Sequence, residues 1–110
     1  MSREVRKYWV KSAFKTNLDS MAVHVKCCMY DIEDGKYETV NLMGREMSYS
    51  DLVDFEIECQ ELLGRAMCGK VTGREYGRIK AISDERNMIR YMQCVSKGMD
   101  EDRASYSFME

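Results

Sequence analysis

The segment from Ser48 to Gly69 carries the strongest structural signal in this 110-residue sequence. Its apolar side chains recur at steps of three and four residues, which places them on one face of a helix. They are Leu52, Phe55, Cys59, Leu62, Leu63 and Ala66. Ser48 is a good N-cap residue, Asp51 stands at the third helical position, and Gly69 suits a helix end. The sequence therefore predicts one main helix over 48–69.

The residues ahead of this helix favour strands. Alternating apolar side chains make 21–29 the clearest strand pattern. Asp34-Gly35 is a hairpin turn signal, because glycine supplies the positive φ, and 37–42 would return as the partner strand. Segment 3–15 fits helical spacing as well as strand alternation, and its aromatic and β-branched residues favour a strand. We thus expect three strands before the helix.

The residues after the helix are harder to interpret. Segment 70–77 contains two glycines and reads as a loop. Residues 79–95 fit a hairpin that turns at 84–87, which we favour, although the apolar spacing within 88–95 also fits a helix. The expected fold class is α+β, with a small antiparallel sheet packed on one main helix in the order β-β-β-α-β-β.

Length and composition indicate one small globular domain. Hydrophobic residues make up 45% of the chain and charged residues 33%, which is ordinary for a soluble protein. We place the domain at 1–97 and expect the acidic, weakly patterned tail 98–110 to be partly disordered. We expect neither a membrane-spanning segment nor a secretory signal peptide. A chain this short buries a modest core, so we expect a homodimer.

The chemistry-bearing residues form no recognisable active site. Five cysteines without a C-x₂-C pair favour free, buried thiols in a reducing cytosol over a metal site. The single histidine, His24, lies too far from Cys28 for a direct contact if both stand on an extended strand. Residues 64–71 nearly match the phosphate-binding loop G-x-x-x-x-G-K-[ST], but Val71 replaces the Ser or Thr and a helix ends there. We expect no enzyme activity, no metal and no cofactor.

Charge is strongly segregated, although the net charge is only −2. Residues 1–16 hold five basic and one acidic side chain, and residues 63–90 hold seven basic and three acidic ones. Residues 31–62 hold two basic and ten acidic side chains. Cations interleaved with an exposed aromatic ring suit a phosphate backbone, because the cations release counterions and the ring can stack. Alternating cations also protect the edge of a sheet, so that alternative stays open.

This pattern predicts a non-enzymatic accessory protein that binds nucleic acid through a basic face, with Trp9 as the aromatic contact. The candidate contact residues are Arg3, Arg6, Lys7, Trp9, Lys11, Lys15, Lys70, Arg74, Arg78, Lys80, Arg86 and Arg90.

The alternative is a small protein–protein interaction module, such as a phage-encoded inhibitor of a host defence protein. Its candidate contacts are a methionine-rich surface and an acidic stripe on the main helix, formed by Asp51, Asp54, Glu58 and Glu61. The chain holds ten methionines, and methionine lines adaptable binding surfaces. The stripe is also compatible with a solvated helix face that binds nothing.

The order of the expected elements resembles a known family. A basic N-terminal strand leads into Ala22-Val23-His24-Val25. The Asp34-Gly35 hairpin, one helix and a glycine-rich return follow, and Ile79-Lys80-Ala81-Ile82-Ser83 then precedes a final Tyr91-Met92 segment. Over residues 3–96 this pattern resembles the small histone-like, double-strand DNA-binding proteins of protein-primed tailed phages. The resemblance implies a dimer that coats DNA without sequence preference in the cytoplasm of a bacterial host. It also implies that the basic N-terminal residues Arg3, Arg6 and Lys7 contact the DNA.

Overall fold

The computed structural model describes the backbone of residues 7–96 and the side chains of residues 7–93. Arg3, Arg6 and the expected tail 98–110 lie outside the described residues. The elements follow in the order β1 (Lys7–Trp9), α1 (Ser12–Glu33), β2 (Val40–Leu42), β3 (Arg45–Met47), α2 (Tyr49–Met67), β4 (Lys70–Thr72) and α3 (Gly73–Ser96). The α+β fold class is confirmed. Within the described residues, however, three helices replace the one main helix, and two separate two-stranded ribbons, β1–β4 and β2–β3, replace the single sheet.

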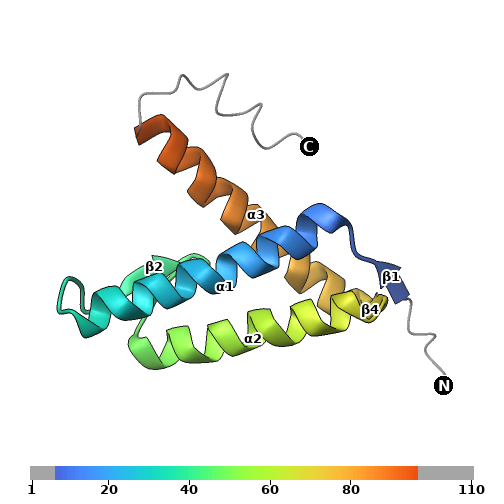
Figure 1. Cartoon of the computed structure of the whole chain (residues 1–110), viewed down its shortest axis with the longest axis horizontal. Helices are drawn as coiled ribbons and strands as arrows, with labels where there is room; N and C mark the ends of the chain where they lie inside the picture. Colours follow the sequence, from blue (N-terminus) through green and yellow to red (C-terminus); the bar gives the residue numbers. More distant parts are fainter. Residues whose placement is uncertain (1–6, 97–110) are drawn as a thin grey trace.

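The three helices enclose one apolar core. α1 and α2 run antiparallel beside each other, and α3 crosses α1 so that its second half extends past the α1–α2 pair (Figure 1). The β1–β4 ribbon lies at the end of the molecule where α2 ends and α3 begins (Figure 1). The fully buried large side chains of the helices are Leu18, Met21, Val25, Leu52, Cys59, Ile79 and Ile82. No helix within residues 7–96 has the length and apolar character needed to cross a bilayer.

Helix α2 confirms the strongest sequence prediction. The Ser48 hydroxyl accepts a hydrogen bond from the Asp51 backbone N–H at 3.3 Å, and the Ser48 backbone N–H donates to the Asp51 carboxylate at 3.0 Å. This reciprocal capping box satisfies two donors that the first helical turn leaves open. At the other end Gly69 takes φ +120°, a backbone conformation that favours glycine and ends the helix.

The predicted strand at 21–29 is wrong, because these residues lie inside α1. The same residues carry a second pattern: Leu18, Met21 and Val25 recur at helical spacing and are fully buried, whereas the alternating residues Val23 and Cys27 are exposed. Packing against α2 and α3 thus selects the helix over the local β preference of the valines. Gly35 has the positive φ expected of it, but it follows the end of α1 and does not form a β-hairpin turn.

The first and third predicted strands are confirmed only in part. Segment 3–15 forms a strand at Lys7–Trp9 and is helical from Ser12 onward. Segment 37–42 contains β2, but its partner is β3 at Arg45–Met47, where no strand was predicted. The turn between them is Met43-Gly44, and both residues have positive φ, which suits a tight hairpin.

The predicted hairpin over 79–95 is also wrong, and the helix that we left open is present from Gly73 to Ser96. Its start is set by a second capping box, in which the Thr72 backbone N–H donates to Glu75 at 2.9 Å and the Glu75 backbone N–H donates to Thr72 Oγ1 at 3.2 Å. Lys70 to Thr72, expected in a loop, form β4 and pair with β1. The T-x-x-E spacing at 72–75 is a local signal that would have located the start of this helix.

Candidate nucleic-acid interface

The β1–β4 ribbon sorts its side chains onto two faces. Its antiparallel register pairs Lys7 with Thr72, Tyr8 with Val71, and Trp9 with Lys70. Because successive side chains on a strand point to opposite faces, Tyr8 and Val71 share the inner face, and Val71 is fully buried. Lys7, Trp9 and Lys70 share the outer face and are exposed. The ribbon thus presents two lysines and the only tryptophan of the chain on one surface.

An aromatic cluster supports the ribbon from beneath. The Tyr8 ring stacks on the Tyr76 ring of α3, with centroids 5.0 Å apart, and Phe14 of α1 lies tilted against Tyr76 at 6.0 Å. Gly73 lets the backbone of α3 approach this cluster, because an added Cβ there would lie 3.1 Å from the Tyr8 ring. These contacts hold the ribbon against both α1 and α3.

Trp9 is the most exposed large apolar side chain among the described residues, with 71% of its surface accessible. The ammonium of Lys70 lies 5.3 Å from the centre of its ring, within the range of a cation–π contact. An exposed indole ring offers a flat face for stacking together with an N–H donor. Trp9 is therefore the side chain of this ribbon that is best placed to contact a ligand.

Further cations flank the ribbon where the two adjoining helices begin. Lys11 directly precedes α1 and Lys15 follows one turn later, while Arg74 lies in the first turn of α3. The positive ends of both helix dipoles add to the same potential. None of the ion pairs among the described residues uses Lys7, Lys11, Lys15, Lys70 or Arg74. We call the ribbon's outer face together with these flanking cations the ribbon surface; its members are Lys7, Trp9, Lys11, Lys15, Lys70 and Arg74.

Two of the remaining predicted cations lie on the first half of α3. Arg78 is held by Glu58 of α2, since its Nε and Nη2 each donate to the carboxylate at 2.7 Å. These hydrogen bonds raise the pKa of Arg78 and neutralise its charge locally. Lys80 is exposed, further along α3 than Arg74. The structure therefore leaves Arg78 without the free charge that a phosphate contact needs.

Arg86 and Arg90 belong to the second half of α3, away from the ribbon. The Nε and Nη1 atoms of Arg86 are buried and have no hydrogen-bond partner within the described residues. Burial and the neighbouring charge of Arg90 lower the pKa of Arg86. The predicted basic residues therefore do not form one surface. The prediction assumed a hairpin over 79–95, whereas these residues form a helix.

The acidic stripe of α2 is not one free acidic face. Asp51 is occupied by the capping box, whose hydrogen bonds from Ser48 lower the pKa of its carboxyl group. Glu58 is occupied by Arg78. Asp54 and Glu61 remain exposed. Because two of its four carboxylates already have partners, the stripe does not form one continuous acidic contact surface.

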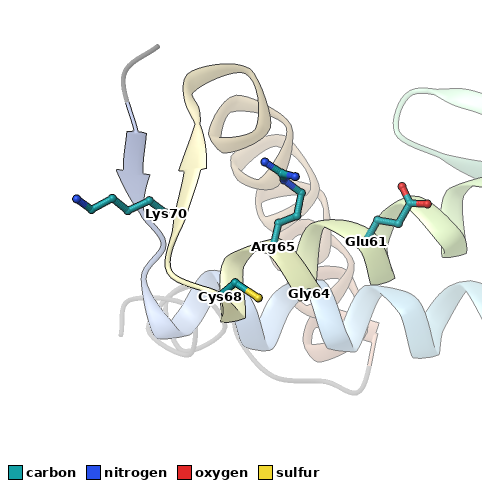
Figure 2. A pocket seen from close by; sticks show the side chains of 5 residues that line it. All are labelled: Glu61, Gly64, Arg65, Cys68 and Lys70. Carbon is teal, nitrogen blue, oxygen red and sulfur yellow. The ribbon is translucent and has the colours of Figure 1, made fainter. Parts of the chain in front are cut away.

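A hollow beside the ribbon falls on the near-match to the phosphate-binding loop. It is lined by Glu61, Gly64, Arg65, Cys68 and Lys70, and the Lys70 side chain points away from those of Cys68 and Glu61 (Figure 2). The backbone N–H groups of Cys68 and Gly69 donate to carbonyls of the last turn of α2, at 3.2 Å. They are therefore not free to hold a phosphate, and these residues form a helix end as the sequence indicated.

His24 and Cys28 lie closer than predicted, with Nε2 and Sγ 3.7 Å apart, because a helix brings residues four apart onto one face. Burial lowers the pKa of His24 and raises the pKa of Cys28, so both shifts favour the neutral forms. An activated Cys–His pair needs the thiolate, and this one is disfavoured. The four cysteines with described side chains are free, but Cys27 and Cys68 are exposed where we expected buried thiols.

An apolar hollow at the second half of α3 was not predicted from the sequence. It is lined by His24, Asn41, Leu42, Met88, Ile89, Met92 and Gln93, where α3 diverges from α1 and the β2–β3 ribbon. Met88 and Met92 are 59% and 60% exposed. Their spacing of four residues was visible, but only the position of α3 shows that both lie outside the core.

Comparisons with known proteins found no family model, curated protein or solved structure that matches this chain. The resemblance to the phage DNA-binding family therefore stays a prediction. Elements on which it was based differ in the structure, because Ala22-Val23-His24-Val25 lies inside α1 and Asp34-Gly35 follows the end of that helix.

Proposed function

We propose that this protein is a non-enzymatic nucleic-acid-binding protein that contacts its ligand through the ribbon surface. The observation that carries the proposal is Trp9, which lies 71% exposed beside Lys70 on the outer face of a small, well-supported ribbon. An aromatic ring and surrounding unpaired cations match the two parts of a nucleotide, the base and the phosphate.

The free charges make this contact electrostatic in origin. Each cation that neutralises a phosphate releases a counterion, so affinity falls as salt rises. With all the cations of the ribbon surface engaged, the slope of log K against log salt is about −3.5 for a single strand and about −4.5 for a duplex.

The test is a binding series with labelled oligonucleotides at low salt, followed by anisotropy or gel shift. We expect binding at micromolar protein that weakens steeply with salt, and the double substitution Lys7→Ala with Lys70→Ala should weaken it about tenfold or more. Lys26→Ala with Lys36→Ala is the control, because it removes the same number of charges from α1 and from the turn after it, away from the ribbon surface. Absence of any shift at low salt, or equal losses from the control, overturns the proposal.

A second candidate function is a protein–protein interaction module, favoured by the apolar hollow at Met88 and Met92. Met88 and Met92 expose more than half of their surface at this hollow, which suits a partner that offers apolar side chains. Of the acidic helix face that we expected to contribute, only Asp54 and Glu61 remain exposed without a partner named above.

The two surfaces are separable by substitution. The double change Met88→Glu with Met92→Glu should abolish stoichiometric recovery of one protein partner from a bacterial lysate. Met67→Glu should not, because Met67 is 68% exposed at the end of α2, outside the hollow. Equal recovery with both variants contradicts this candidate and leaves the nucleic-acid proposal untouched.

A further inference from the structure

We infer that the ligand of the ribbon surface is an unpaired strand, with one of its bases stacked on the Trp9 ring. This inference rests on the proposed function and specifies its substrate class. It differs from the family resemblance, which implies binding to double-stranded DNA.

The Trp9 ring is both exposed and held in position. Most of the ring is open to solvent, and the Lys70 ammonium at 5.3 Å lies against it. The cross-strand pair Trp9–Lys70 and the Tyr8–Tyr76 stack beneath it fix the ribbon from which the ring projects. A positioned, solvated ring of this kind offers a stacking platform to any base whose face is free.

Reaching a base inside a duplex costs free energy. Paired bases already stack on their neighbours, so an aromatic wedge must first unstack a step. Proteins that do so recover the cost over an extensive basic surface. Here Arg78 is held by Glu58, and Arg86 and Arg90 lie away from the ribbon, so only a few cations surround Trp9. A free strand exposes its bases without that cost.

The spacing of Trp9 and its neighbouring lysines along the ribbon also favours a single strand. Lys7 stands two residues from Trp9 on the same face of β1, which corresponds to about 7 Å along the strand. Lys70 stands directly across from Trp9. A nucleic-acid strand lying along β1 thus meets the Trp9 ring with Lys70 beside it, and then meets Lys7. This arrangement suits alternating bases and phosphates.

The experiment compares a short oligothymidylate with a duplex of the same length at matched ionic strength. Trp9 is the only tryptophan of the chain, so its fluorescence reports directly on the ring. We expect the oligothymidylate to bind more tightly than the duplex and to quench Trp9. Trp9→Ala should weaken single-strand binding about tenfold, as measured with labelled oligonucleotide, and Trp9→Phe should weaken it less.

The outcomes separate the inference from the function beneath it. If the duplex binds as tightly as the single strand, or Trp9→Ala binds the single strand like the wild type, the inference is overturned and the proposed function stands. If neither oligonucleotide binds at low salt while circular dichroism shows a folded chain, the proposed function fails and the inference fails with it.

Discussion

At the scale of single residues, buried polar contacts decide where the helices cross. Asn17 of α1 is buried, and its side-chain amide donates to the Ser83 hydroxyl of α3 at 2.6 Å and to the Asn87 side-chain oxygen at 3.3 Å. A buried polar group is costly when it lacks a partner, so this pair favours one crossing point over others. This contact could not be predicted from the sequence, because the partners of Asn17 lie more than sixty residues away.

Asn17→Ala should therefore destabilise the protein by about 1–3 kcal/mol, because it leaves the buried Ser83 hydroxyl without its partner. Asn87→Ala is the matched comparison and should cost less, since its contact is longer and only partly buried. Urea unfolding of the variants measures the difference. An Asn17→Ala variant as stable as the wild type contradicts this account of the crossing.

His24 should give the stability a dependence on pH near neutrality. Burial lowers its pKa first, the charge of Arg86 lowers it further, and Glu85 opposes the shift. Because folding disfavours the protonated ring, the stability associated with His24 is complete above the ordinary histidine pKa and is lost as pH falls. We expect the free energy of unfolding to decrease from about pH 7 to about pH 5. His24→Gln should remove that part of the decrease, and an unchanged slope in this variant would argue against it.

At the scale of elements, short strands are positioned by the helices that they connect. β1 and β4 have three residues each, too few for an isolated ribbon to be stable. Their inner face packs through Tyr8 onto Tyr76. The alternation within 7–9 was readable from the sequence, and it correctly placed Lys7 and Trp9 on one face. Their partner was not readable, because β4 lies sixty residues further on and was expected to be a loop.

Tyr76→Ala should release the ribbon from α3, although Tyr76 is not part of the ribbon surface. We expect a loss of about 2 kcal/mol in stability, from the removed ring contacts with Tyr8 and Phe14, and weaker oligonucleotide binding. Tyr76→Phe keeps the ring and should keep both properties. Urea unfolding and anisotropy measure the two effects, and wild-type affinity in a destabilised Tyr76→Ala variant would show that the support is not needed for binding.

At the scale of the whole molecule, folding separates the basic residues that the sequence places in two segments. The cations of the ribbon surface gather at one end of the molecule, whereas Arg78 is held by Glu58, Lys80 lies further along α3, and Arg86 and Arg90 lie on its second half. Ion pairs between α2 and α3 account for this, because Arg78 reaches Glu58 and Arg65 reaches Glu75. A net charge per segment does not show which charges will neutralise each other after folding.

The expected homodimer remains a prediction at this scale. Sedimentation equilibrium should give a mass twice that of the 12.9 kDa chain. If the second copy covers the exposed methionines of α3, Met88→Glu with Met92→Glu should shift the equilibrium to the monomer, while Met67→Glu should not. A wild-type monomer at all accessible concentrations contradicts the prediction.

The sequence by itself determined what depends on neighbours along the chain. The capping box at Ser48 and Asp51, the apolar face of α2 and the helix end at Gly69 are all local, so their physics is complete within a few residues. Only the tertiary structure decided whether 21–29 would be helix or strand, which segment would pair with β1, and whether Arg78 would be free. Each of these choices is made by contacts between residues distant in sequence, whose packing and charge pairing outweigh local preference.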